Sequence, residues 1–262
     1  LIDEVRIYNR VLSGDDVKAL YQSGATAVNR SQTDTLKNGL VGMWSFDGKF
    51  LSRGKALDSS GNNNDGNLTS GPVPAVGKVG QALSFDGVND YVDAGDINAL
   101  DNPVSLSACA WVKHNTLTDD DVIVAKMTNT TTGGFLLFRD DVAAVSGRTD
   151  TYHMFVSKDS TTFVRMEGAT DASRANIWTH VCGVYTRSSA TGLRLYVNGA
   201  EDANSPVSTA SLDSINSGTD PVRIGDSAEA ANRPLNGLID EVRIYNRALT
   251  AEEVKRLYSM GR

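Results

Sequence analysis

The chain has 262 residues, of which 40% are hydrophobic and 22% are charged, an ordinary balance for a globular domain. Its net charge of −7 comes without a cluster of Lys and Arg, which argues against nucleic acid and anionic membranes as partners. No run of 18 apolar residues occurs, so we expect no membrane insertion.

The first ten residues, LIDEVRIYNR, return unchanged at 238–247, and sixteen of the 24 aligned positions are identical when the next fourteen are included. Alternation of apolar and polar residues predicts a strand in each copy. In the second copy Thr250 and Glu253 form a capping-box pattern, so a short helix should begin there and end at Gly261. The repeat period of 237 residues is about one all-β domain long. We therefore expect 1–24 to be the strand-helix tail of a preceding repeat.

Residues 25–38 are polar and without periodicity, as in a linker. From Gly39 onward, short apolar-alternating runs are separated by Gly, Asn, Asp and Ser, which predicts an all-β antiparallel sandwich over 39–262. The dipeptide Asn198-Gly199 predicts a hairpin turn. The expected strands are 39–46, 81–86, 90–95, 104–113, 121–127, 134–139, 151–157, 161–167, 177–185, 192–199, 220–226 and 238–247.

Two acidic features are candidates for a cation. The loop DSSGNNNDGN at 58–67 offers Asp58 and Asp65 beside Asn62, Asn63 and Asn64, a suitable oxygen set for Ca²⁺. The alternative for this loop is an Asx-rich turn without metal. Asp240 shares strand parity with Val242 and Ile244, so we expect it on the buried side, where a carboxylate must be hydrogen-bonded, paired or bound to a metal.

Both cysteines, Cys109 and Cys182, lie inside apolar alternating stretches. They are either two unrelated buried thiols or a disulfide between neighbouring strands, which would indicate an oxidising compartment. The residues alone leave both readings open.

Signs of catalysis are lacking in the sequence. The histidines His114, His153 and His180 have no metal-binding spacing such as HExxH, and neither a GxSxG elbow nor a P-loop occurs. The E-x-D-x-x-E run of sandwich-fold β-glucanases is also missing. We therefore expect no enzyme activity.

Several motifs in order carry a family resemblance: GLVGMWSFDG, DSSGNNNDGNL, VGQALSFDGVNDYVDAGD, VSLSACAWVK, WTHVCGVY, LRLYVNG and GLIDEVRIYNRALTAEEV. Together they resemble the laminin-G-like, concanavalin A-like jelly-roll modules of secreted microbial proteins, which are related to pentraxins. The resemblance implies a two-sheet jelly roll with one concave face, polar rim loops and a short C-terminal helix. It also implies a disulfide between Cys109 and Cys182.

The same resemblance implies a structural Ca²⁺ on the convex side. The matching ligand positions are Asp47 or Asp58 early in the chain and Asp240 late, with Asp65 as a further candidate. The acidic cluster that serves pentraxin-type ligand calcium is missing, so the resemblance does not extend to that route of ligand binding.

These observations favour a non-catalytic binding or adhesion module of a secreted, multi-repeat protein. Its ligand would be a glycan or another component of the cell surface or matrix. A purely structural tandem spacer is the alternative, and a polysaccharide hydrolase or lyase is least favoured. The N-terminal copy of the strand and helix is expected to dock on an exposed edge or on a neighbouring chain, as a route to self-association.

Overall fold

The computed structural model describes residues 35–117, 120–128, 133–140, 151–169, 173–215, 217–228 and 233–261. The chain divides into two compact units, Leu1–Asn38 and Gly39–Arg262. The duplicated segment 1–24 and most of the expected linker lie outside the described residues, so the docking of that segment stays a prediction. In the described part of the first unit, the Asn38 amide donates to the Thr35 carbonyl at 3.2 Å.

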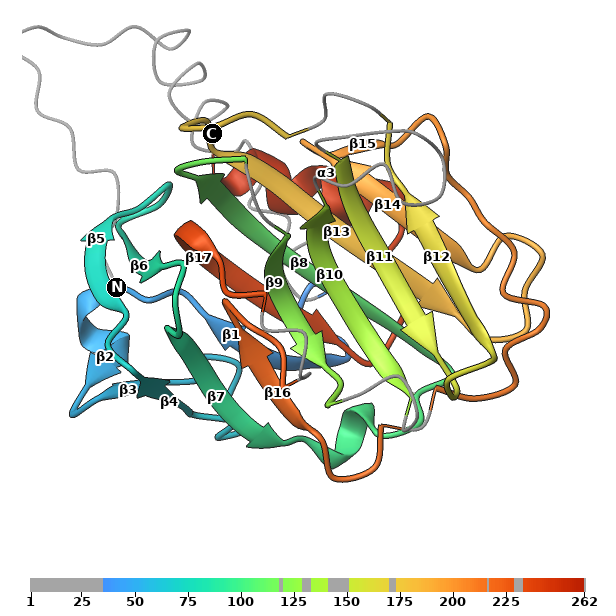
Figure 1. The fold of residues 1–262 in the computed structure, drawn as a ribbon, viewed down its shortest axis with the longest axis horizontal. Helices are drawn as coiled ribbons and strands as arrows, with labels where there is room; N and C mark the ends of the chain where they lie inside the picture. The colour runs from blue at the N-terminus through green and yellow to red at the C-terminus, as the bar shows by residue number, and fades with distance from the viewer. Residues whose placement is uncertain are drawn as a thin grey trace, which may run out of the picture. The chain divides into compact units, whose positions relative to one another are not determined.

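The second unit consists of two antiparallel sheets (Figure 1). Sheet A has the order β15-β14-β13-β8-β17-β6-β5, with β1 paired to β17, and sheet B has the order β12-β11-β10-β9-β16-β7-β4-β3-β2. Sheet A contains β1 (Leu40–Trp44), β5 (Val73–Val76), β6 (Gln81–Asp86), β8 (Ser105–His114), β13 (Thr179–Thr186), β14 (Leu193–Val197), β15 (Ala200–Glu201) and β17 (Asn236–Tyr245). Sheet B contains β2 (Leu51–Ser52), β3 (Lys55–Ala56), β4 (Gly66–Thr69), β7 (Tyr91–Asp96), β9 (Asp121–Lys126), β10 (Gly134–Asp140), β11 (Thr151–Ser157), β12 (Phe163–Glu167) and β16 (Pro221–Ile224).

The core lies between the two sheets because alternate side chains of each strand point inward. On β8, Leu106, Ala108, Ala110 and Val112 all belong to this core. Sheet B contributes alternate residues of its strands, such as Phe135 and Leu137 of β10 and Met154 and Val156 of β11. The predicted all-β jelly-roll sandwich is confirmed.

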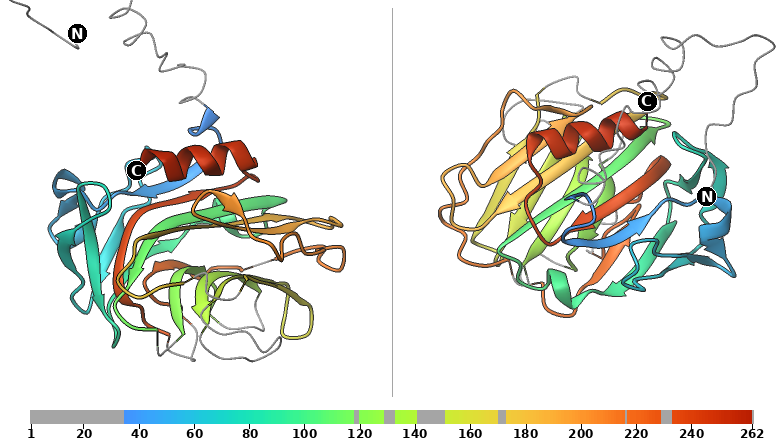
Figure 2. Two further views of the ribbon diagram at one scale, coloured as in Figure 1. Left: turned by 90° about the horizontal axis from the view of Figure 1, so that it is seen from above. Right: turned by 180° about the vertical axis from the view of Figure 1, so that it is seen from behind.

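Helix α3 (Ala251–Met260) lies against the side of sheet A that faces away from sheet B (Figure 2). It begins with the predicted capping box between Thr250 and Glu253. Its Tyr258 ring stacks on Trp111 of β8 with centroids 5.5 Å apart. Gly261 follows directly, and a Cβ there would come within 2.5 Å of the Trp111 ring. The helix therefore covers the outer side of sheet A around Trp111.

Two short 3-10 helices, η1 (Gly48–Phe50) and η2 (Asn98–Leu100), connect strands. The predicted hairpin at Asn198-Gly199 joins β14 to β15, with Val197 paired to Ala200 and both turn residues at positive φ. The short strands β2–β5 and β15 were not among the expected elements, since runs of two to four residues carry too little periodicity to be recognised. No helix among the described residues has the length and apolar character needed to cross a membrane.

Candidate functional site

The two cysteines are joined in a disulfide. Cys109 of β8 and Cys182 of β13 are direct partners in the antiparallel ladder, and both are buried. The pairing is the one that the family resemblance implies.

Two of the four predicted metal ligands meet at one turn. Residues 77–81 lie between β5 and β6, where the Gly77 amide donates to the Gly80 carbonyl at 3.1 Å. The Val79 amide donates to Oδ2 of Asp240 at 2.8 Å. The Gln81 amide donates to Oδ1 of Asp47 at 3.0 Å. The turn thus connects carboxylates that are far apart in the sequence.

Glycines make this close approach possible. A Cβ on Gly80, which has φ +59°, would lie 2.0 Å from Oδ1 of Asp47. A Cβ on Gly77 would lie 2.7 Å from Oδ2 of Asp240. A side chain at either position would therefore push the turn away from the carboxylates.

Asp240 is fully buried, as predicted, but it does not share a side with Val242. The register between β17 and β8 shifts between Asp240 and Arg243, and Glu241 sits at φ +53°, which is a β-bulge. The extra residue reverses the alternation, so Val242 faces the core while Asp240 is paired opposite Trp111, on the α3 side. The predicted parity was wrong for this reason.

Burial leaves the Asp240 carboxylate with too few hydrogen bonds and raises its pKa. Its Oδ1 is buried and has no hydrogen-bond partner among the described residues. Burial raises the pKa of the Asp240 carboxyl to about 7, against the opposing effect of the Val79 amide. A buried oxygen in this state fits a cation nearby.

Asp47 and Asp240 are the two predicted ligands that this turn contacts, and carboxylate oxygens are of the type that a hard divalent cation prefers. The set is small, because no group of three or more His, Cys, Asp or Glu side chains suited to a metal occurs in the described parts of the chain. Backbone carbonyls and water would have to complete the six to eight oxygens that Ca²⁺ takes.

Asp58 and Asp65 are not brought to this turn by any described contact; they organise their own loop. Oδ1 of Asp58 accepts the amides of Met43 at 2.9 Å and Ser60 at 2.8 Å, and Oδ2 accepts the Asn64 amide at 3.0 Å. Asp65 accepts the Asp58 amide at 2.9 Å. This is the arrangement of an Asx-rich turn, and it gives the loop a fixed shape without a metal.

The outer side of sheet B carries a second group of candidate residues, which we call the β11–β12 face: His153 and Phe155 of β11 with Phe163, Arg165 and Glu167 of β12. Phe163 is 53% exposed and stacks on Phe155 with centroids 5.4 Å apart. Phe155 is the ladder partner of Arg165, and His153 is the partner of Glu167. An exposed aromatic ring thus lies beside fixed polar groups.

Arg165 is held in place from several sides. Its Nε donates to Nδ1 of His153 at 3.0 Å, and its guanidinium pairs with Asp140 and lies 3.6 Å from Glu167. The Arg165 Cζ is 5.2 Å from the centre of the Phe138 ring. These contacts fix the guanidinium plane before any ligand arrives.

His153 stays neutral in this setting. It is only 3% exposed, and its Nε2 lies 2.5 Å from the Thr151 hydroxyl. Burial, reinforced by the charge of Arg165, lowers the pKa of His153 to about 3. Since Nδ1 accepts from Arg165, the proton of the neutral ring belongs on Nε2.

Sequence reasoning did not single out the β11–β12 face. The available signal was the alternation in FVRME, where Phe163, Arg165 and Glu167 share one parity and Val164 and Met166 the other. That pattern identifies an outward-facing row, but not that Phe155 would support it.

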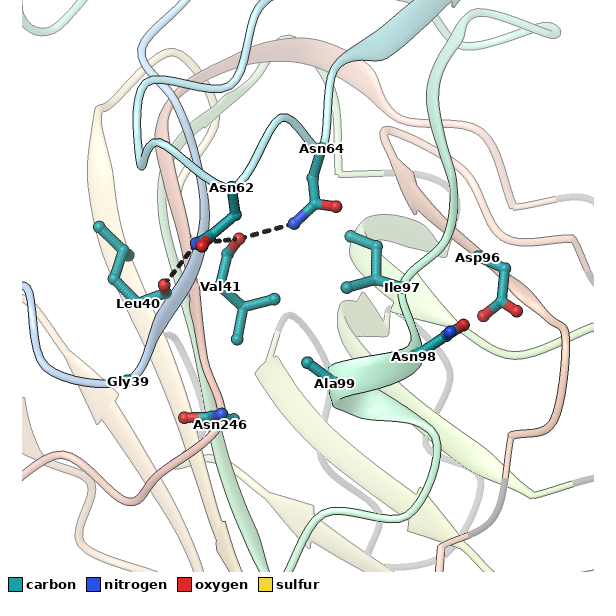
Figure 3. A pocket seen from close by; sticks show the side chains of 10 residues that line it. All are labelled: Gly39, Leu40, Val41, Asn62, Asn64, Asp96, Ile97, Asn98, Ala99 and Asn246. Carbon is teal, nitrogen blue, oxygen red and sulfur yellow. Dashed lines mark hydrogen bonds between the residues drawn. The ribbon is translucent and has the colours of Figure 1, made fainter.

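A cavity of about 410 Å³ lies between the start of β1 in sheet A and the end of β7 in sheet B. Figure 3 shows its lining by the start of β1, the loop that holds Asn62 and Asn64, residues 96–99, and Asn246. Its polar groups are mostly side-chain amides.

Known proteins resemble the chain at two levels. The family model Laminin_G_3, of the concanavalin A-like lectin/glucanases superfamily, matches residues 86–255. No curated protein sequence matches the chain.

Solved structures resemble the fold of the chain. Domain 4 of AbnA, a GH43 extracellular arabinanase from Geobacillus stearothermophilus in complex with arabinotriose, has a TM-score of 0.62 and 24% identity over 84% of this chain and 98% of its own. The binding domain of Paraclostridial Mosquitocidal Protein 1 has a TM-score of 0.65 and 19% identity over 86% of this chain and 53% of its own. Trypanosoma rangeli sialidase has a TM-score of 0.57 and 17% identity over 84% of this chain and 32% of its own.

The structural likeness supports the jelly-roll architecture, and the family model covers most of that sandwich. The chain belongs to the concanavalin A-like lectin/glucanases superfamily.

Proposed function

We propose that the domain is a non-catalytic glycan-binding module of a secreted protein and that its ligand lies on the β11–β12 face. The observation that carries the proposal is the exposed Phe163 ring, supported by Phe155 and flanked by a fixed Arg165. The family and the arabinanase domain solved with arabinotriose support glycan as the ligand class. The disulfide is compatible with an extracellular location.

The chemistry of the face suits a sugar ring. The apolar side of a pyranose or furanose can lie on Phe163, because an aromatic ring offers a large rigid apolar surface at small entropic cost. Arg165 can donate to ring or hydroxyl oxygens, and the Glu167 carboxylate can accept from hydroxyl groups. Preorganised partners lose little conformational freedom on binding, which favours affinity.

The carboxylates of this region favour binding over cleavage. A glycosidase needs one carboxyl group as a proton donor and a second as base or nucleophile. Asp140 and Glu167 both lie against the Arg165 cation, an arrangement that positions the guanidinium. We therefore propose that glycans bind here without turnover.

Phe163→Ala is expected to weaken glycan binding at least tenfold, because it removes the stacking surface. The measurement is a glycan array probed with the labelled wild-type chain and this variant. Val76→Ala is the matched control, since Val76 is 85% exposed on β5, in the other sheet. Equal binding by both variants would contradict the proposed face. Silence of the wild-type chain over the whole array would favour the structural spacer, the role that the duplicated sequence suggests.

We also propose that the family's structural calcium is held by Asp47, Asp240 and backbone carbonyls of the 77–81 turn. Calcium at 100 times its dissociation constant should stabilise the fold by about 2.7 kcal/mol. The measurement is urea unfolding with calcium and with chelator. Asp240→Asn should abolish the calcium increment, whereas Asp58→Asn, which alters a loop outside this turn, should retain it. A calcium increment that survives Asp240→Asn, or is lost in Asp58→Asn, would place the ion elsewhere.

A further inference from the structure

The cavity drawn in Figure 3 is lined by β1, the loop at 58–65, the segment around η2 and Asn246. Its volume of about 410 Å³ falls in the range of small-ligand sites. It is distant from the β11–β12 face. In sheet B five inter-strand steps separate β12 from β7, and η2 follows β7, so the two sites are roughly 24 Å apart at the spacing of neighbouring strands.

We propose that this cavity is a second binding site and that it takes a neutral saccharide ring. The proposal extends the glycan-binding function but uses none of the β11–β12 residues. Three features of the lining carry it: fixed amide groups, compensated charge and an apolar surface.

The amide wall is preorganised. The Asn62 amide nitrogen donates to the carbonyl oxygens of Leu40 at 2.8 Å and Val41 at 3.0 Å. The Asn64 amide nitrogen donates to the same Val41 oxygen at 2.8 Å. The Asn64 carbonyl of the backbone accepts the Trp44 indole N–H at 3.0 Å. With its nitrogen bound to Val41, Asn64 keeps Oδ1 on the side away from Val41 (Figure 3).

Asp58 is the residue that holds this wall in shape. Its carboxylate binds the backbone amides of Met43, Ser60 and Asn64, so it connects the loop to β1. The acidic, Asn-rich sequence at 58–67 therefore has a function in this account without a metal: it presents Asn62 and Asn64 to the cavity in one geometry. A ligand then gains hydrogen bonds without ordering the loop.

The charge of the cavity is compensated, which selects a neutral ligand. Among the ten described lining residues Asp96 alone is charged. Its Oδ1 is 2.7 Å from the ammonium of Lys126, which is fully buried and also lies 3.1 Å from Asp101. The Lys126 ammonium is therefore buried and is not accessible to an anionic ligand, and the charge of Asp96 is already paired with it. Hydroxyl groups, which both donate and accept, match the remaining amides.

The apolar part of the lining completes the match. Ile97 and Ala99 border the cavity on the side across from Leu40 (Figure 3). A sugar ring has hydroxyl groups at its edge and C–H groups on its faces, so its edge can meet the amides while one face lies on the exposed Ala99, beside the buried Ile97. A linear polyol has no comparable face to bury.

The test is a titration followed by NMR of the side-chain amides of ¹⁵N-labelled full-length protein. The probes are arabinose, xylose, galactose, glucose and N-acetylglucosamine, each to about 50 mM, which exceeds the millimolar affinity expected of a single ring. At least one sugar should shift the Asn62 and Asn64 amide signals and saturate. Glycerol over the same range should not saturate.

Two variants make the result decisive. Ala99→Trp should fill the cavity and weaken the saturating sugar at least tenfold, with the unfolding midpoint close to wild type because Ala99 is exposed. Asn64→Ala should weaken it as well. Phe163→Ala should leave these shifts unchanged, which separates this site from the β11–β12 face. Saturation by none of the sugars, or undiminished shifts in Ala99→Trp, would overturn the proposal.

Discussion

Lowering the pH from 7 to 5 is expected to remove about 4 kcal/mol of histidine contribution from the free energy of unfolding, because two buried histidines resist protonation, and the buried Asp240 carboxyl offsets about 2 kcal/mol of this loss. Burial lowers the pKa of His153 and of His180 to about 3 each, with Arg165 and Arg243 acting in the same direction. In the unfolded chain both titrate near 6.5. The neutral forms therefore contribute stability that is present above pH 6.5 and is lost as the pH falls toward 3.

The size of the histidine contribution follows from how steeply the free energy of unfolding changes with pH for each histidine. Between pH 6.5 and 5 the unfolded chain binds up to one more proton per histidine than the folded chain does. This difference lowers the free energy of unfolding by about 2 kcal/mol for each histidine. His114, whose pKa burial also lowers, adds to the effect. Carboxyl groups of the unfolded chain titrate near 4 and contribute little above pH 5. Asp240 is the exception, because burial raises its folded-state pKa to about 7, so it gains a proton in the folded chain and opposes the histidines by about 2 kcal/mol.

The measurement is urea unfolding at pH 7, 6 and 5 for the wild type, His153→Gln, His180→Gln and the double variant. Between pH 7 and 5 each single variant should lose about 2 kcal/mol less stability than the wild type, whatever its stability at pH 7. A double variant that retains the full wild-type slope would contradict the assignment.

Reduction of the Cys109–Cys182 disulfide is expected to cost about 4 kcal/mol. The two cysteines are separated by 73 positions, and opening a loop of this length restores considerable conformational entropy to the unfolded chain. The two strands stay paired through backbone hydrogen bonds and core packing, so the fold itself should persist in the reduced state at neutral pH.

The double variant Cys109→Ala/Cys182→Ala gives the measurement without a reductant present. Its urea midpoint should fall well below that of the oxidised wild type. Added reductant should lower the wild-type midpoint to a similar value and leave the variant unchanged. Equal midpoints for oxidised wild type and variant would show that the bond contributes little.

The strands and the helix were predictable because their signals are local. Alternation along the longer strands and the capping box at Thr250 each involve residues a few positions apart, and physical preference acts on them directly. The burial of Asp240 was also predictable, but the side it faces was not. A β-bulge depends on how two strands pair, and no residue pattern around Glu241 announces it.

The sites depend on contacts between distant segments, which explains why they were predicted less well. Asp47 and Asp240 are linked through the 77–81 turn, which donates one backbone amide to each carboxylate. Asp58 is a candidate metal ligand in the sequence because an Asx-rich turn and a calcium loop use the same residue types. In the structure its carboxylate accepts the amides of Met43 and Asn64, and its role as a metal ligand stays a prediction. Phe163 becomes notable only through its stacking on Phe155.

The central claim is that the β11–β12 face binds glycan and does not cleave it. Calorimetric titration of the strongest glycan from the array, with an assay of new reducing ends in the same samples, tests both halves. We expect a saturable binding heat and no formation of new reducing ends. Phe163→Ala should weaken the binding at least tenfold, and Val76→Ala should leave it unchanged. Binding that is indifferent to Phe163, or reducing ends that accumulate with time, would contradict it.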